Sequence, residues 1–335
     1  MARSVTFLVD PTMVGSGPEL PRDVYGCLGR VVRTDLCYHY ATPVCAQRWL
    51  DVCADPAYGH QDLLEAVSAI MPEVAARLAS DATARRLALC SLGPGEGSVD
   101  ERMLVGLAPA FVGVSYTGLD SSFELLRHSA RRLATAPGLP DDLPITAVCG
   151  DFTSVRELPV PADPGAVRLF ALTGFTLGNY SEARLLRDIA SRMEEGDYLF
   201  LDVRLHPFGS LPEDMGTFNR AREDVLASYD LESVRRFVFG PVEVATTAVA
   251  ADVGFGFEFA RSVTSVPNAL NLILYCTGLE ATLRLTGERV RRERLDLAVT
   301  TSYHLPDLGA WLGRSPFATV WQGTADGVAF FLLRK

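Results

Sequence analysis

Short apolar runs alternate with amphipathic stretches through the middle third of the chain. The apolar runs predict strands over 87–92, 111–119, 145–149, 167–172 and 196–203. Helical spacing of apolar residues predicts helices over 98–107, from Ser121 (the expected N-cap) through Leu133, and over 181–193. Strands that alternate with helices of this length form a parallel sheet with helices on both faces. The pattern therefore predicts a doubly wound α/β domain over about residues 61–205.

The pattern changes after His206 and Pro207. Residues 211–238 are predicted to be helical, and residues 240–303 consist of strand-like runs that predict an antiparallel insertion. The expected core positions of the helical part are Phe218, Val225, Leu226 and Val234. A short helix over 306–312 and a hairpin of strands 317–322 and 328–333, with a glycine-containing turn, complete the chain. The hairpin makes the expected sheet mixed and seven-stranded.

Composition excludes several classes of protein. Of the 335 residues, 48% are hydrophobic and 21% charged, so the chain can bury a large core and is not disordered. The 31 Lys and Arg against 41 Asp and Glu give a net charge of −10, which argues against nucleic acid and anionic membranes as partners. The basic run 289–294 is interpreted as the solvated face of a strand. Without an apolar run of membrane-spanning length or a signal-peptide pattern, we expect a cytoplasmic protein.

The cysteines predict neither disulfides nor a metal site. There are seven, an odd number, and none forms a Cys-x-x-Cys pair. The one cluster to consider comprises Cys37, His39, Cys45, Cys53 and His60. Its spacing matches no established metal-binding pattern, so we expect no bound metal.

Residues with binding chemistry follow the first three predicted strands. Segment 93–97 contains three glycines, Asp120 follows the second strand, and Asp151 and Phe152 follow the third. In an open α/β sheet, ligands bind at the carboxyl ends of the strands. A glycine turn allows close approach to a ligand, Asp120 is placed to accept hydrogen bonds from ribose hydroxyls, and Asp151 with Phe152 suits an adenine.

Each of these residues also has a structural interpretation. The glycines can form an ordinary tight turn, Asp120 can cap a helix, and Asp151 can belong to a loop. Their joint placement after three successive strands favours a ligand site. The chain lacks both the full G-x-G-x-x-G spacing and a P-loop, which disfavours nicotinamide dinucleotides and nucleoside triphosphates. An adenosine ligand without pyrophosphate, S-adenosylmethionine (SAM), fits better.

Several motifs resemble the histidine-specific Nα-methyltransferase family. The most specific is Leu172-Thr-Gly-Phe-Thr-Leu-Gly-Asn179, which is similar to the family's G-[ST]-T-[IL]-G-N block. Other similar segments are 92–95, 150–152, 217–220, the tract 49–58 and the hairpin that contains Trp321. The resemblance implies a class I SAM-methyltransferase fold, a doubly wound seven-stranded mixed sheet with a second α+β substrate domain. The expected division is 61–205 with 306–335 for SAM binding, and 1–60 with 206–305 for substrate.

The resemblance also implies the site residues. The expected cofactor-binding residues are Gly93, Gly95, Asp120, Ser121, Asp151, Phe152, Thr173 and Gly174. Asn179 would hold the α-amine of an amino acid, Tyr40 would reach its carboxylate end, and Tyr58 would face its side chain; Asn179 and Tyr40 are the expected catalytic residues. The remaining expected substrate-binding residues are Phe218, Asn219, Thr300 and Ser302.

Departures from the family pattern indicate a changed substrate. Thr300 stands where the family carries the carboxylate that reads the imidazole, so we expect a substrate other than histidine. Further departures are Ser91, Gly59 and the segment 204–206. A structural interpretation of Asn179, as a polar cap before Ser181, is the weaker alternative. The aromatic residues of 255–259 and Tyr275 suit either an apolar substrate side chain or plain core packing.

The predicted function is SAM-dependent N-methylation of a free amino acid or an amino-acid-derived small molecule, in secondary metabolism. One alternative is intramolecular cyclisation of SAM to a cyclic amino acid, with release of methylthioadenosine. The other is a SAM-binding protein without catalysis.

Overall fold

An eight-stranded mixed sheet forms the centre of the molecule. The computed structural model describes residues 3–9, 39–81, 86–159, 165–227 and 229–335. The strand order is β1 (Val5–Val9), β4 (Ile145–Cys149), β3 (Gly113–Asp120), β2 (Arg86–Leu92), β5 (Val167–Leu172), β6 (Tyr198–Arg204), β11 (Val328–Arg334) and β10 (Ala318–Ala325). The first six strands are parallel, and the β10–β11 hairpin is antiparallel. All seven expected strands are present.

The eighth strand was not expected. β1 pairs in parallel with β4 from Val5–Ile145 to Val9–Cys149, so residues 5–9 belong to the large sheet rather than to a substrate domain. β1 is an edge strand, and the side chains of Phe7, Leu8 and Val9 are exposed. Four of its five residues, Val5, Phe7, Leu8 and Val9, are nevertheless apolar, and this run was not assigned to a strand from the sequence alone. The rest of the expected division remains a prediction.

Alternate residues of the central strands face two helical layers. Leu87 and Leu89 of β2 pack with α3 (His60–Asp81) and α4 (Ser98–Leu107), while Cys90 and Leu92 join the core of the opposite face. That second core includes α6 (Glu182–Ala190) and α10 (Leu305–Leu312), and α5 (Phe123–Thr135) lies against β3 and β4. Burial on both faces explains why these strands are apolar at nearly every position.

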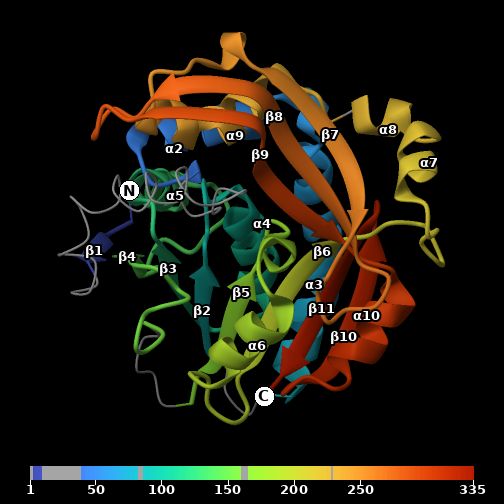
Figure 1. Ribbon diagram of the computed structural model, residues 1–335. Coiled ribbons are helices and arrows are strands. Elements are labelled where there is room, and N and C mark those ends of the chain that lie inside the picture. Colours follow the sequence, from blue (N-terminus) through green and yellow to red (C-terminus); the bar gives the residue numbers. More distant parts are fainter. Residues whose placement is uncertain (1–2, 10–38, 82–85, 160–164, 228) are drawn as a thin grey trace.

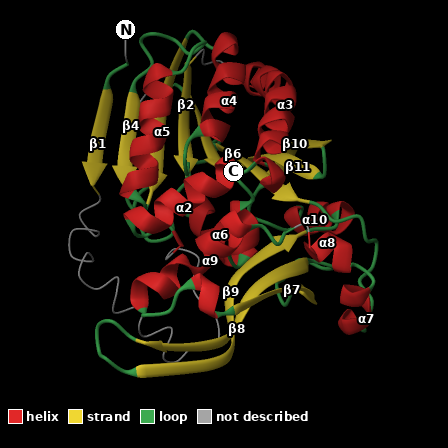
Figure 2. Ribbon diagram, turned by 90° about the horizontal axis from the view of Figure 1, so that it is seen from above, coloured by secondary structure: helices red, strands yellow, loops and turns green. Residues whose placement is uncertain are grey.

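A second, three-stranded antiparallel sheet lies at one end of the large sheet (Figure 1). It consists of β7 (Gly254–Arg261), β8 (Leu270–Thr282) and β9 (Arg289–Ser302) in that order. The helices of this part are α2 (Pro43–Ala54), α7 (Met215–Arg220), α8 (Glu223–Ala227) and α9 (Glu232–Ala245). α2 packs on α9, and Figure 2 shows both near β8 and β9. A third hydrophobic core joins α9 to this sheet.

Two local predictions were wrong. The N-cap of α5 is Ser122, whose hydroxyl accepts a hydrogen bond from the backbone N–H of Leu125 at 3.4 Å, and not Ser121. Val225 is 47% exposed, because α8 is a single turn whose neighbour Leu226 enters the core instead. Within the described residues, no helix has the length and hydrophobicity needed to cross a bilayer. The described cysteines are free thiols.

Candidate active site

A cavity of about 550 Å³ lies where the two sheets meet. Its floor comprises the loops that follow β2, β3, β4 and β5, and its roof comprises parts of α2, α9, β8 and β9. It is lined by every expected cofactor residue: Gly93, Gly95, Asp120, Ser121, Asp151, Phe152, Thr173 and Gly174. Of the expected substrate residues, Tyr40, Tyr58, Asn179 and Thr300 also line it. Three loops expected to share one ligand therefore do face a single cavity.

Asp120 ties the glycine turn to the start of α5. Its two carboxylate oxygens accept hydrogen bonds from the backbone N–H of Gly95 at 3.2 Å and of Ser122 at 2.8 Å. Gly93 and Gly95 have φ values of 78° and 56°, which glycine adopts without strain. Burial raises the pKa of Asp120 to about 6, although the two backbone hydrogen bonds oppose the shift. The carboxylate is thus fixed at the cavity wall and charged above pH 6.

The turn after β4 presents Phe152 beside the glycine loop. A Cβ atom at Gly93 would lie 3.4 Å from the Phe152 ring, so the two loops are in contact across the cavity floor. Asp151 accepts hydrogen bonds from the backbone N–H and the hydroxyl of Thr153, both at 2.8 Å. The carboxylate shapes its own loop and also lines the cavity, so its two interpretations are compatible.

Asp202 of β6 holds the segment that follows β5. Its buried carboxylate accepts hydrogen bonds from the backbone N–H groups of Gly174 at 3.0 Å and Phe175 at 2.6 Å. These bonds stabilise a left-handed conformation at both residues, with φ values of 72° and 62°. The conformation is unusual for phenylalanine and is typical of functional loops. Burial raises the pKa of Asp202 to about 6. Sequence reasoning had not singled out Asp202.

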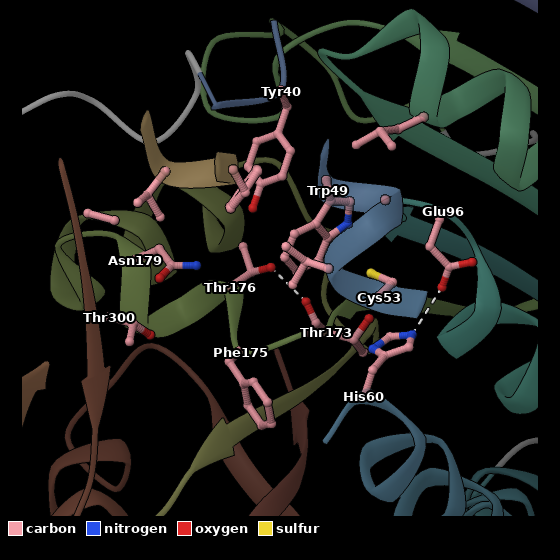
Figure 3. Close-up of a pocket in the computed structure, with 18 of the residues that line it drawn as sticks. Tyr40, Trp49, Cys53, His60, Glu96, Thr173, Phe175, Thr176, Asn179 and Thr300 are labelled. Carbon is pink, nitrogen blue, oxygen red and sulfur yellow. Dashed lines mark hydrogen bonds and ion pairs between the residues drawn. The ribbon is translucent and has the colours of Figure 1, made fainter. Parts of the chain in front are cut away.

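Asn179 ends a 3₁₀ turn, η5 (Thr176–Asn179), that packs tightly on β9. A Cβ atom at Gly178 would lie 2.6 Å from the carbonyl oxygen of Thr301, so only glycine allows this approach. No described residue forms a hydrogen bond with the side-chain amide of Asn179, which is drawn at the cavity in Figure 3. The following helix has Ser181 as its N-cap. Among the described residues, the amide of Asn179 therefore has no hydrogen-bond partner that a ligand would have to displace.

Aromatic rings form the wall opposite the cofactor loops. Trp49 contacts Tyr40, Tyr58 and Phe237 with ring centroids 5.7, 6.0 and 5.1 Å apart. Burial raises the pKa of Tyr40 well above its usual value, with the nearby Tyr58 adding to the shift, and burial also raises the pKa of Tyr58. Both phenols are neutral at physiological pH and can donate hydrogen bonds.

Three expected substrate residues do not line the cavity. Phe218 is buried against Phe208 and Phe259, with ring centroids 5.0 and 5.9 Å apart. The side-chain amide of Asn219 bonds both backbone groups of Phe259, which fastens α7 to β7. Ser302 is buried outside the cavity. The structure therefore places these three residues away from the cavity, and a role in substrate binding stays a prediction.

The aromatic residues of β7 and β8 also lie outside the cavity wall. Phe255, Phe257 and Phe259 belong to or pack on the third core, and Arg294 lies over the ring of Tyr275 at 3.9 Å. The positions of these aromatic residues therefore favour core packing over contact with a substrate side chain.

Cys53, His60 and Glu96 bring potential metal-ligand atoms within 4.8 Å of one another at one end of the cavity. Cys37, of the cluster weighed from the sequence, lies outside the described residues. His60 Nε2 lies 3.2 Å from Glu96 and 2.8 Å from the hydroxyl of Ser98. Arg132 pairs with the same carboxylate at 2.9 Å. The carboxylate of Glu96 thus already has hydrogen-bond donors and a cation as partners. These contacts stabilise the glycine turn.

Comparison with known proteins identifies the family. The profile described as "Histidine-specific methyltransferase, SAM-dependent" matches residues 47–224, more than half of the chain. The chain belongs to this family. The methyltransferase is thus SAM-dependent, and the cavity fits that cofactor: glycine turns allow close approach, and a fixed carboxylate and a buried ring face the same space. No curated protein matches the methyltransferase.

Solved structures with some similarity include other methyltransferases. The plantazolicin methyltransferase BpumL in complex with S-adenosyl-L-homocysteine (SAH) is 11% identical, with a TM-score of 0.40, and the match covers 94% of this chain and 99% of that one. The glycopeptide N-methyltransferase MtfA with SAH is 12% identical, with a TM-score of 0.39, and the match covers 78% of this chain and 86% of that one. A SAM-dependent methyltransferase from Methanosarcina mazei is 14% identical, with a TM-score of 0.37, over 74% and 92%. Similarity at this level carries no information on the substrate.

Several cavity residues were missed from the sequence: Trp49 as a wall residue, Glu96, Arg204, Tyr229 and Phe237. Arg204 ends β6, so the rule that ligands bind at the carboxyl ends of strands would have found it. Tyr229 and Phe237 carry no comparable signal, because only the folding of α9 over the large sheet brings them to the site.

Proposed function

We propose that this methyltransferase N-methylates a free amino acid, or a small molecule derived from one, other than histidine. The observation that carries the proposal is the side-chain amide of Asn179, which no described residue occupies and which lines the same cavity as the cofactor residues. A fixed amide beside a cofactor site is suited to orienting an amine.

On the cofactor side, the proposed SAM-binding residues are those that line the floor of the cavity. Asp120 accepts hydrogen bonds from ribose hydroxyls, Asp151 accepts one from the adenine amine, and Phe152 lies against the base. When bound, SAM supplies a methyl group that an amine nitrogen accepts as the carbon–sulfur bond breaks. Glycines at 93 and 95 leave room for this ligand because they carry no side chain.

On the substrate side, Asn179 Oδ1 accepts a hydrogen bond from the neutral amine and directs its lone pair. Tyr40, a neutral phenol, donates to the carboxylate end. Holding an amine in one orientation next to the methyl donor is the main source of rate enhancement, since a neutral amine needs no strong base. Tyr58 and Trp49 exclude water from the reacting groups.

Thr300 supports a substrate other than histidine. It lines the cavity on β9, where a hydroxyl replaces the carboxylate expected in the family. An imidazole bound there would lose a charged acceptor for its ring N–H.

The test uses SAM with a deuterated methyl group and the twenty common amino acids, with products identified by mass spectrometry. A labelled amino acid other than histidine supports the proposal. Release of methylthioadenosine without a labelled acceptor supports cyclisation instead, and absence of both products contradicts methylation of a free common amino acid. Asn179→Ala is expected to lose the labelled product while it retains SAH affinity. Gln47→Ala, at an exposed position of α2, is the control that keeps both.

A further inference from the structure

Arg204 brings a positive charge to the wall of the cavity. It is the last residue of β6, is partly buried and lines the cavity. Its guanidinium carbon lies 4.7 Å from the centre of the Phe175 ring and 5.8 Å from that of Tyr229. Nη1 donates a 3.4 Å hydrogen bond to the Tyr229 hydroxyl. Two aromatic contacts therefore fix the position of the guanidinium plane.

No carboxylate among the described residues forms an ion pair with this guanidinium. Asp202 lies two residues earlier on the same strand, but both of its oxygens accept hydrogen bonds from the backbone of Gly174 and Phe175. Other arginines of the described chain do have carboxylate partners, among them Arg48, Arg132, Arg168, Arg235 and Arg294. Arg204 therefore interacts with the charge of Asp202 without a direct ion pair, and none of its N–H groups donates to a carboxylate of the described residues.

The surroundings of Arg204 favour a bound anion. Aromatic and aliphatic side chains, including Tyr58, Leu231 and Val234, line the same cavity and reduce access of water. A cation in such surroundings is costly unless an anion accompanies it. Guanidinium has five N–H donors in a planar fork, of which Tyr229 uses one, and the fork matches the two oxygens of a carboxylate.

We propose that Arg204 binds a carboxylate of the substrate. The proposal rests on the proposed function in one respect, namely that an amino-acid-like molecule occupies the cavity. The carboxylate has two possible sources, the α-carboxylate of a free amino acid or a second carboxylate in the rest of the molecule. Either source makes Arg204 a specificity-determining residue, because a neutral analogue leaves its charge unpaired.

The test measures binding rather than catalysis. The SAH-saturated protein is titrated calorimetrically with the twenty common L-amino acids and with their α-carboxamides. We expect at least one acid to bind about 10-fold or more tightly than its amide, as for a charge-assisted pair. If only aspartate and glutamate bind tightly, and their α-carboxamides bind equally tightly, then Arg204 binds the second carboxylate of the molecule rather than the α-carboxylate. In Arg204→Met the acid should bind only as well as the neutral form, with Arg204→Lys intermediate.

The matched control is Arg222→Met. Arg222 also lies over aromatic rings, 4.3 Å from Phe208 and 4.4 Å from Phe218, but does not line the cavity. It should keep the preference for the acid, and unchanged SAH affinity shows that each variant is folded. The proposal is overturned if the wild type shows no preference for any carboxylate, or if Arg204→Met retains it. Carboxylate preference without methyl transfer would overturn the proposed function alone, whereas methyl transfer that is indifferent to Arg204 would overturn this inference alone.

Discussion

At the scale of single residues, polar groups at strand ends both shape the backbone and face the cavity. Asp120 accepts hydrogen bonds from two backbone N–H groups while it lines the cavity, and each carboxylate oxygen has a further lone pair. Asp202 accepts two such bonds and fixes Phe175 in a left-handed conformation. Loss of either carboxylate therefore changes the shape of a loop as well as its charge.

Asp120→Asn should weaken SAH binding by about 10- to 100-fold. The amide nitrogen cannot accept a hydrogen bond, so one of the two backbone N–H groups, or a ligand hydroxyl, loses its acceptor, a loss of about 1.5–3 kcal/mol. Calorimetric titration with SAH measures the effect. Asp252→Asn, at an exposed position outside the cavity, should bind SAH like the wild type. If both variants bound SAH with equal affinity, Asp120 would not be a cofactor-binding residue.

Thr300→Glu should introduce methylation of histidine. Thr300 lines the cavity, so the longer side chain would place a carboxylate there, where the proposed function assigns the family's imidazole acceptor. The wild type should show little labelled histidine, and the variant a clear increase in kcat/KM for it, measured by mass spectrometry of the labelled product. Thr300→Gln is the uncharged control and should gain less. If the wild type already methylates histidine efficiently, the argument from Thr300 is wrong.

At the scale of elements, close packing of η5 on β9 sets where the side-chain amide of Asn179 lies. Gly178 has no room for a side chain because the carbonyl oxygen of Thr301 lies against its Cα. Asn179 follows directly, so its position depends on this contact between two segments far apart in sequence. The left-handed residues 174 and 175 start the same turn.

Gly178→Ala should reduce methyl transfer much more than it reduces SAH affinity. The added Cβ would lie 2.6 Å from a backbone oxygen, which cannot move as a flexible side chain would, so η5 and Asn179 must shift. A displacement of this kind costs on the order of 100-fold in rate. Gly309→Ala, in α10 where the nearest atom is 3.8 Å away, should leave activity unchanged. Equal activity of both variants would contradict the importance of the contact.

At the scale of the whole molecule, burial of acidic residues makes stability depend on pH. Asp100 is fully buried, accepts a 3.2 Å hydrogen bond from Tyr116, and has one oxygen without a partner in the described chain. Burial raises the pKa of Asp100 from 3.8 to about 7. The folded protein therefore holds this proton more tightly than the unfolded chain. The resulting stability is present below about pH 4 and is lost as the pH rises to about 7.

Relative to the wild type, Asp100→Asn should therefore be more stable at pH 8 than at pH 4. The amide avoids a buried charge, can accept from Tyr116 and lies beside Ser91. We expect the difference in unfolding free energy between variant and wild type to grow by roughly 1–4 kcal/mol over this interval. Denaturant unfolding at both pH values measures it. A difference that is independent of pH would show that Asp100 is not protonated in the folded protein at neutral pH.

Much of the architecture follows from sequence alone. Runs such as 87–92 and 167–172 are apolar at all but one position each, because both faces of a central strand are buried. Such runs can be recognised without knowing which segments pack on them. The motifs at 93–97, Asp120 and 150–152 could be placed at one edge because parallel strands end on the same side of a sheet. The cofactor follows from these motifs, and the family follows chiefly from the segment 172–179.

Tertiary structure decided which groups complete the site. Strand β1 was not predicted, because only its pairing with β4 shows that this short apolar run belongs to the large sheet. Phe218 and Asn219 lie outside the cavity because α7 packs on β7. Within the described residues, Arg204 reaches the cavity without a direct ion pair, while the carboxylate of Asp202 accepts hydrogen bonds from the backbone of another loop. The sequence alone shows which polar residues follow each strand, because this depends only on the local order of residues. Which of those groups remain free for a ligand depends on contacts between distant segments, and only the folded chain makes them.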